Sequence, residues 1–283
     1  MSKLFVLVAL ALTVATTTAS TQPATLTGCA NLTADLAKAR PGAKIVITGV
    51  CPAYKISAKS FMPAVTIDAT GATFPNGGLY IADSTGIHMV GGTYGPNPAA
   101  GTFGLSVRGS HDISMVNGRF EDLEYGIVIN EAEHIVVAHN RIDKIRNDSI
   151  RFFNSRFGNI NSNAILGAAL PPGSLDHPDG IQLASPFGHV SDVSITNNTV
   201  AGDSQGIGLF GDDHQNNGFD RITITGNYLA TTYPQALAIQ YCRNCTATGN
   251  TIVTLPGAVH TSAFNQYSNT GITAKGNVFI DLR

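Results

Sequence analysis

The chain has 283 residues, of which 43% are hydrophobic and only 13% charged, and its formal net charge is −2. This hydrophobic content is ample for a buried core and excludes an intrinsically disordered chain. The charge balance provides no basic field, so we expect neither nucleic acid nor a lipid surface as a partner. Thirty glycines and thirteen prolines, with no tryptophan and few good helix formers, favour strands and tight turns.

Residues 1–20 have the pattern of a secretion signal peptide. Lys3 precedes an apolar run from Leu4 to Val14, and small residues follow up to a cleavage position near Ser20. The run is too short for a membrane span, and no later stretch reaches the roughly 18 apolar residues that a span needs. We therefore expect a secreted protein, periplasmic or extracellular, whose mature domain is residues 21–283.

The four cysteines of an exported chain favour disulfide bonds over metal ligands. They fall into two natural pairs, Cys29 with Cys51 and Cys242 with Cys245, and free thiols are the alternative. A redox role for the Cys242-Arg-Asn-Cys245 segment is disfavoured, because it lies among strands and turns without a following helix.

A degenerate repeat follows a short amphipathic helix that we expect from Asn31 to Ala39. Its clearest element is Asn or Gly, any residue, then an apolar or aromatic residue, and it recurs every 22 to 35 residues. The copies begin at Gly92, Gly118, Asn140, Asn163, Asn198, Asn227, Asn250 and Asn277. An alternating apolar segment lies upstream in most units, and it opens at Gly104, Gly126, Ser149, Gly180, Gly206 and Ala236. Because such units cannot bury an apolar face alone, we expect them to stack as a parallel β-solenoid with a column of bonded Asn amides.

The chain resembles the right-handed parallel β-helix proteins, the superfamily of pectate lyases, alginate lyases and epimerases, and polygalacturonases. The resemblance rests on the cap helix, on Pro41-Gly-Ala-Lys-Ile-Val-Ile47 and Val65-Thr-Ile-Asp68, and on the Asn-containing coils, and it covers about residues 25 to 283. It implies an all-β, single-domain right-handed parallel β-helix of about nine coils with a short N-terminal capping helix. The superfamily contains carbohydrate-active enzymes of several chemistries, so the resemblance is specific for the fold and not for one activity. Together with the signal peptide, it leads us to expect a secreted carbohydrate-active enzyme.

Three insertions interrupt the regular coils close to one another. They fall within Leu166–Asp179, Pro186–His189 and Gly211–Gly218, around the strand that begins at Gly180 and around the next one. Long loops on a rigid scaffold commonly carry binding and catalytic groups. We therefore expect a substrate groove in this region.

Stacking of the coils aligns polar residues that are far apart in the sequence. It predicts that Asp148 and Asp179 lie side by side, with Arg151 and Gln182 one step further and His177 close by. The candidate catalytic residues are His177, Asp179, Arg151 and Asp148, and the candidate substrate-binding residues are Gln182, Tyr125, Lys144, Gln205, Asp213 and His214. Asn-Asp-Ser and Pro-Asp-Gly are also good turn formers, so a structural role for both aspartates is the alternative.

This cluster matches the needs of a lyase that cleaves a uronate-containing polysaccharide by β-elimination. Arg151 with Gln182 would hold the sugar carboxylate, His177 or a neighbouring base would take the proton on C5, and Tyr125 or His177 would protonate the leaving oxygen. The aspartates would either bind Ca²⁺ or orient Arg151 and His177.

Three other functions stay open. A C5-epimerase shares the first step of the elimination, and Asp176-His-Pro-Asp179 resembles, in altered order, the Asp-Pro-His signature of alginate epimerases. A glycoside hydrolase would use Asp148 and Asp179 as its two carboxyl groups. Pro178-Asp-Gly-Ile181 resembles a segment of polygalacturonases, whose other motifs have no counterparts in the right coils. The third is a non-catalytic solenoid that binds carbohydrate. The sequence does not determine which polysaccharide is bound or the oligomeric state of the protein.

Overall fold

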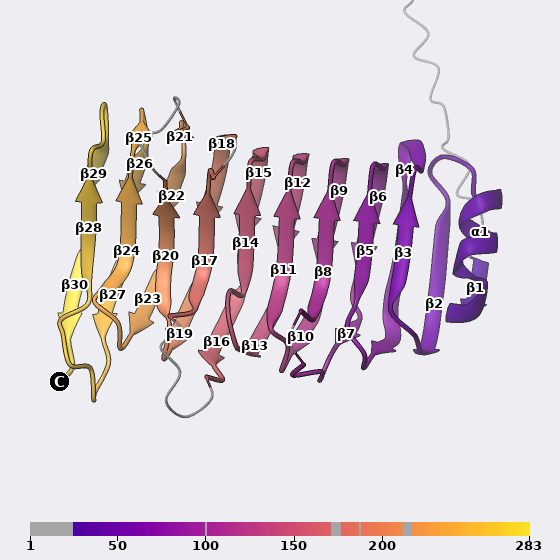
Figure 1. Cartoon of the computed structure of the whole chain (residues 1–283), viewed down its shortest axis with the longest axis horizontal. Coiled ribbons are helices and arrows are strands. Elements are labelled where there is room, and N and C mark those ends of the chain that lie inside the picture. Colours follow the sequence, from indigo (N-terminus) through magenta and orange to yellow (C-terminus); the bar gives the residue numbers. More distant parts are fainter. Residues whose placement is uncertain (1–24, 100, 171–176, 187, 212–216) are drawn as a thin grey trace, which may run out of the picture.

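A computed structural model of the chain describes residues 25–99, 101–170, 177–186, 188–211 and 217–283. Short strands wind into a right-handed parallel β-helix of about nine coils stacked along one axis (Figure 1). The predicted fold class is confirmed, while the expected signal peptide lies outside the described residues. Within the described ranges, no helix is long and apolar enough to cross a membrane.

The strands form three faces. The first face is a nine-stranded sheet of β3 (Tyr54–Ser57), β5 (Leu79–Ala82), β8 (Phe103–Arg108), β11 (Tyr125–Asn130), β14 (Ile150–Phe153), β17 (Asp179–Ala184), β20 (Gln205–Phe210), β24 (Gln235–Gln240) and β28 (Ala263–Tyr267). The second face contains β1 (Thr25–Gly28), β2 (Lys44–Val50), β4 (Ser60–Phe74), β6 (Thr85–Val90), β9 (His111–Val116), β12 (Glu133–Ala138), β15 (Arg156–Asn161), β18 (His189–Thr196), β21 (Gly218–Asp220), β22 (Thr223–Thr225), β25 (Cys242–Arg243), β26 (Thr246–Thr248) and β29 (Thr273–Lys275). The third face contains β7 (Thr93–Tyr94), β10 (Arg119–Glu121), β13 (Arg141–Ile145), β16 (Ala164–Ala168), β19 (Thr199–Gly202), β23 (Tyr228–Thr231), β27 (Thr251–Thr254) and β30 (Val278–Asp281). The last two faces belong to one sheet, because the long strand β4 pairs with both β6 and β7.

The first coil is covered by a helical cap. A 3₁₀ turn (Cys29–Asn31) leads into helix α1 (Leu32–Lys38), which lies at the end of the stack beside β2 (Figure 1). Leu32 and Leu36 of α1 are buried and join the core of the coils. Pro41-Gly42 follows the helix, as the sequence predicts, because proline cannot continue the helical hydrogen bonds.

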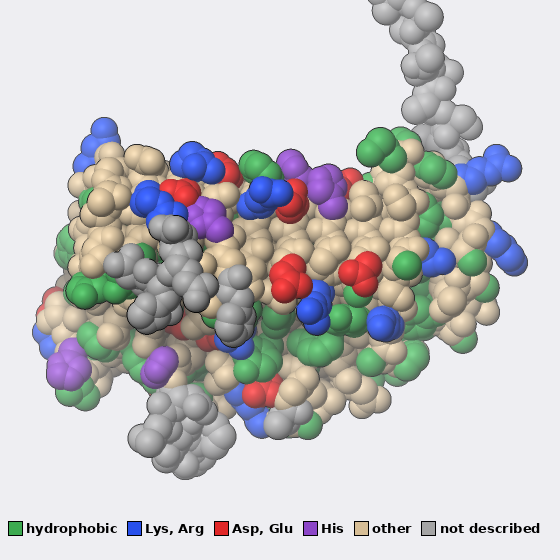
Figure 2. Space-filling model, turned by 45° about the horizontal axis from the view of Figure 1, so that its top comes forward, with side chains coloured by type: hydrophobic (Ala, Val, Ile, Leu, Met, Phe, Trp, Pro, Cys, Tyr) green, Lys and Arg blue, Asp and Glu red, His purple; other side chains and the backbone are tan. Residues whose placement is uncertain are grey.

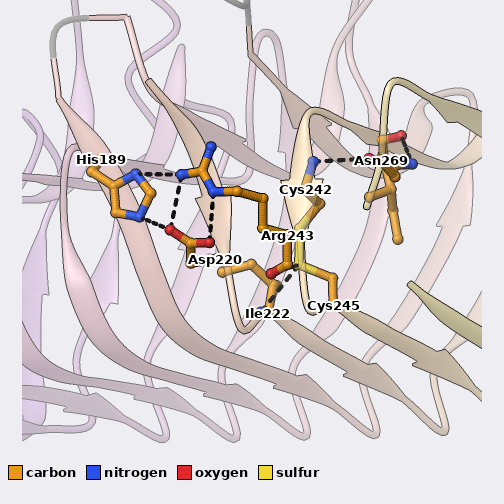
Figure 3. The surroundings of a disulfide bond; sticks show 8 residues. His189, Asp220, Ile222, Cys242, Arg243, Cys245 and Asn269 are labelled. Carbon is orange, nitrogen blue, oxygen red and sulfur yellow. Dashed lines mark hydrogen bonds and ion pairs between the residues drawn. A yellow bond between two sulfur atoms is a disulfide. The ribbon is translucent and has the colours of Figure 1, made fainter. Parts of the chain in front are cut away.

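Both expected cysteine pairs are disulfide-bonded. Cys29–Cys51 ties the cap to the segment after β2, with a Cα–Cα distance of 5.3 Å. Cys242–Cys245 encloses Arg243, with a Cα–Cα distance of 6.0 Å (Figure 3). Arg243 pairs with Asp220, its Nε lying 2.8 Å from Oδ1. This disulfide therefore fixes the backbone that presents an ion pair at the edge of the second face.

A column of buried asparagine amides runs through the later coils, as the repeat predicts. Each Nδ2 donates to the Oδ1 of the next asparagine at 2.9–3.0 Å, in the order Asn140, Asn163, Asn198, Asn227, Asn250 and Asn277. The other hydrogen of each Nδ2 is donated to a backbone carbonyl of a strand on the second face, such as Ile160 O of β15 for Asn198. Because each inner member, from Asn163 to Asn250, is bonded to the asparagine before it and to the one after it, the column fixes the register of the stack.

Asn198→Ala is expected to lower the free energy of unfolding by about 3 kcal/mol. The substitution removes the acceptor for Asn163 N and Nδ2 and leaves these buried donors unpaired. Urea denaturation measures the loss, and Asn159→Ala, at an exposed position of β15, serves as the control. Equal stability of the two variants would contradict a structural role for the column.

Candidate functional site

The parallel register of the first face assembles the candidate site from strands β14, β17 and β20. Arg151 pairs with Gln182 across β14 and β17, and Asp179 pairs with Gln205 across β17 and β20. Asp148 lies in the turn before β14, and its Oδ1 accepts a hydrogen bond of 3.0 Å from Asp179 N. Residues 26 to 31 positions apart in the sequence thus become direct neighbours, as the repeat predicts.

Arg151 is held in place by a buried carboxylate and two aromatic rings. Its Nε lies 2.9 Å from Asp148 Oδ2, and the side chains are 25% and 3% exposed respectively. The guanidinium carbon lies 5.0 Å from the ring centre of Tyr125 and 4.4 Å from that of Phe153. Cation–π contacts and the ion pair therefore fix a partly exposed cation on the outer surface of the first face.

The two aspartates occupy different electrostatic environments, although both are buried. Burial raises the pKa of Asp148, while the Arg151 cation opposes the rise. Burial and the neighbouring Asp148 charge raise the pKa of Asp179 to about 8. Asp179 is therefore the carboxyl group of the pair that holds its proton more tightly, whereas the Arg151 cation favours the charged form of Asp148.

A proton on Asp179 also satisfies its hydrogen-bonding partners. Asp179 Oδ2 accepts from Gln182 Nε2 at 2.8 Å. Asp179 Oδ1 and Gln205 Oε1 are both buried acceptors without a hydrogen-bond donor among the described residues. Because the register places Gln205 beside Asp179, a proton on Oδ1 can donate to Oε1 and pair both atoms.

A cavity of about 530 Å³ lies next to these residues on the first face. His177, Gln182, Gln205, Phe210, Tyr233, Pro234 and Gln235 line it. Tyr233 and Pro234 also line a second cavity of about 590 Å³, which continues toward His260. The ring of Phe210 lies directly over Gly208, where any Cβ would be only 2.1 Å from a ring atom. The first cavity, which we call the groove, has aromatic and amide walls suited to a polar ligand, and the second adjoins it at Tyr233 and Pro234.

The described structure brings seven of the ten candidate residues together. Asp148, Arg151, Asp179, Gln182, Gln205 and Tyr125 form one contact network, and the exposed His177 lines the adjoining cavity. Lys144 lies on β13 of the third face, where its charge acts on Glu121 instead. Asp213 and His214 lie outside the described residues.

Phe153 is a site residue that the sequence reasoning did not select. It follows Arg151 by two positions on β14, and side chains two apart on a strand share one face of the sheet. This alternation is the signal that would have identified it. Tyr233, which the cavity walls add to the site, lies in the turn before β24.

Three comparisons place this chain among known proteins. The family model described as periplasmic copper-binding protein (NosD) matches residues 62–231. Among solved structures, the Dettilon tailspike protein gp208 is similar with a TM-score of 0.60 and 16% identity, over 89% of this chain and 58% of that one. Pectate lyase Pel9A is similar with a TM-score of 0.50 and 13% identity, over 86% of this chain and 71% of that one. No curated protein sequence matches. This chain thus spans a little over half of the tailspike, and the likenesses define a shared fold.

Proposed function

The chain belongs to the NosD family of right-handed β-helix proteins, and from this premise we propose that its groove binds an acidic polysaccharide and cleaves it by β-elimination. The observation that carries the proposal is the position of Arg151, whose cation is fixed on the outer surface of the first face beside Gln182. A guanidinium held in this way can bind a uronate carboxylate through two parallel hydrogen bonds. The family is described as periplasmic, which supports an exported protein acting on such polymers.

In the proposed mechanism Arg151 and Gln182 hold the carboxylate on C5 of the sugar. Neutralising this carboxylate makes the C5 proton more acidic. His177, an exposed residue on the wall of the cavity, takes that proton. The electron pair of the C–H bond forms the C4=C5 double bond, the bond from C4 to the leaving oxygen breaks, and Tyr125 or His177 protonates that oxygen.

Asp148 acts on this reaction through Arg151. Ca²⁺ needs six to eight oxygen ligands, whereas both Asp148 oxygens face donors within the protein. Asp179 is moreover buried, and burial and the Asp148 charge raise its pKa to about 8, which disfavours the charged form that binds a cation. We therefore propose that the aspartates orient Arg151 and Gln182 and do not bind Ca²⁺.

A glycoside hydrolase is the second candidate, because the raised pKa of Asp179 is what a general acid requires. A hydrolase also needs both carboxyl groups to reach the glycosidic bond. Asp148 and Asp179 are only 2% and 1% exposed, and Asp148 is paired with Arg151. Gln182, Gln205 and His177 line the groove, and the partly exposed Arg151 cation lies beside Gln182 in the register, which favours elimination.

The proposal is tested by ultraviolet absorbance of the protein with uronate polysaccharides, beside a reducing-sugar assay. Elimination is expected to produce absorbance from the unsaturated uronate, and the rate is expected to persist in EDTA. Reducing ends without absorbance would instead support the hydrolase. If neither absorbance nor reducing ends appear but the C5 proton exchanges with solvent, the result would support an epimerase. Binding of the polysaccharide with no reaction would support a non-catalytic solenoid.

The family description also names copper, and one group of side chains in the described structure fits this metal. All four cysteines are in disulfides, and Met89 and Met115 are packed in the core. Met62 is then the one exposed sulfur ligand among the described residues, which is too few for a Cu⁺ site. His111, Glu133 and His134 provide nitrogen and oxygen donors within 4.8 Å of one another, which suits Cu²⁺. Copper bound there would add positive charge at the edge of the second face, and no step of the elimination involves it.

A further inference from the structure

Two histidines and a glutamate converge where β9 and β12 begin. Glu133 pairs with His111 in the register, and the ring centres of His111 and His134 lie 4.6 Å apart. Figure 2 shows histidine side chains gathered beside acidic ones at the upper edge of the molecule, in line with β9 and β12 of Figure 1. The group lies on the second face, away from the groove on the first face.

Neighbours on β15 restrict two of these side chains. The His134 ring stacks on Phe157, with ring centres 4.8 Å apart and planes inclined by 16°. Glu133 Oε1 accepts a hydrogen bond of 2.7 Å from Arg156 Nε. None of the described residues hydrogen bonds Glu133 Oε2, so this oxygen is available to a ligand. Two of the three donors, Glu133 and His134, are thus partly preorganised by packing from the next coil.

We infer that His111, Glu133 and His134 form a binding site for one divalent transition-metal ion, with Cu²⁺ as the preferred metal. Two donors of one ion, at bonds of about 2.0–2.1 Å, lie at most about 4.2 Å apart. The three donor atoms lie within 4.8 Å of one another, so small rotations of partly exposed side chains close the site. Imidazole and carboxylate ligands select Cu²⁺ or Zn²⁺ over Ca²⁺ or Mg²⁺, and the affinity of such a site is higher for Cu²⁺ than for Zn²⁺.

Arg156 is a competitor of the metal in this site. Its guanidinium holds one oxygen of Glu133 and adds a positive charge next to the ion. Removing this charge frees the carboxylate for coordination. A metal site therefore predicts that the loss of Arg156 strengthens binding, whereas a purely structural cluster predicts no gain.

Calorimetric titration of the untagged full chain with CuCl₂ and with ZnCl₂ tests the inference. We expect one saturable site per chain, tighter for Cu²⁺, with nitrogen hyperfine structure in the electron paramagnetic resonance spectrum of bound Cu²⁺. His111→Ala and His134→Ala should each weaken this site by at least about tenfold. Arg156→Gln should strengthen it by up to about fivefold.

His139→Ala is the matched control. His139 is an exposed histidine just after β12, and it shares the positive φ of His134, 57° against 55°. Its substitution should leave the affinity unchanged. The inference is overturned if no saturable site exists, or if His111→Ala/His134→Ala retains it. The elimination assay measures activity of the groove on the first face, whereas these titrations measure metal binding on the second face. Failure of the proposed elimination and failure of the metal site are therefore distinguishable.

Discussion

Arg151→Gln is expected to lower kcat/KM for an acidic polysaccharide by about a hundredfold or more. The substitution removes the cation that neutralises the sugar carboxylate, and no other Lys or Arg side chain contacts the Asp148–Asp179 network in the described residues. It also leaves the buried Asp148 carboxylate without its counter-charge, which should cost about 2–3 kcal/mol of stability. Initial rates by ultraviolet absorbance and urea denaturation measure the two effects.

A double variant separates these two effects. Asp148→Asn/Arg151→Gln removes both charges, so it should recover most of the lost stability and none of the lost activity. Arg108→Gln is the matched control, because Arg108 lies on β8 of the same face and is 60% exposed in its pair with Glu131. Full activity in Arg151→Gln, or its recovery in the double variant, would remove Arg151 from substrate binding.

The pairing of residues in this site could be predicted from the sequence, because equivalent positions in successive coils of a solenoid lie side by side in adjacent strands. The positions of Arg151 and Gln182 relative to Ser149 and Gly180 are the same, and the two side chains pair in the structure. The same spacing argument applies to His111 and Glu133, which lie one coil apart before equivalent apolar strands. No short metal-binding motif marks these residues in the sequence, because the ligands come from two neighbouring coils.

The burial of the aspartates could not be predicted from that pattern. Asp148 and Asp179 lie where the chain turns into a strand, and period-two alternation does not extend through a turn. Whether a carboxylate there faces the solvent depends on the turn geometry and on a partner in the next coil, here Asp179 N for Asp148. Lys144 was likewise placed near the groove by proximity in sequence, although it follows the asparagine turn onto the third face.

Asp179→Asn is expected to remove a large pH dependence of stability. The pKa of Asp179 rises from 3.8 to about 8 on folding, so between these values the folded state holds a proton that the unfolded state has released. The stability contributed by this group is complete below about pH 4 and is lost as the pH rises through 8, by up to about 1.4 kcal/mol per pH unit. Urea denaturation of both proteins from pH 4 to 8 should show a steeper decline for the wild type.

The same variant distinguishes the two proposed chemistries. An asparagine at 179 can accept from Gln182 and donate to Gln205, as the protonated acid does, so elimination near pH 6 should continue at a rate within a few-fold of the wild type. Above pH 8 the wild type should lose activity, because ionised Asp179 places a second negative charge beside Asp148 and repels the uronate, whereas the variant should not. If Asp179 were instead the general acid of a hydrolase, the variant would lose activity at every pH, since an amide cannot donate the required proton. If the elimination rates of the wild type and the variant change with pH in the same way, the Asp179 carboxyl group is not protonated in the active protein.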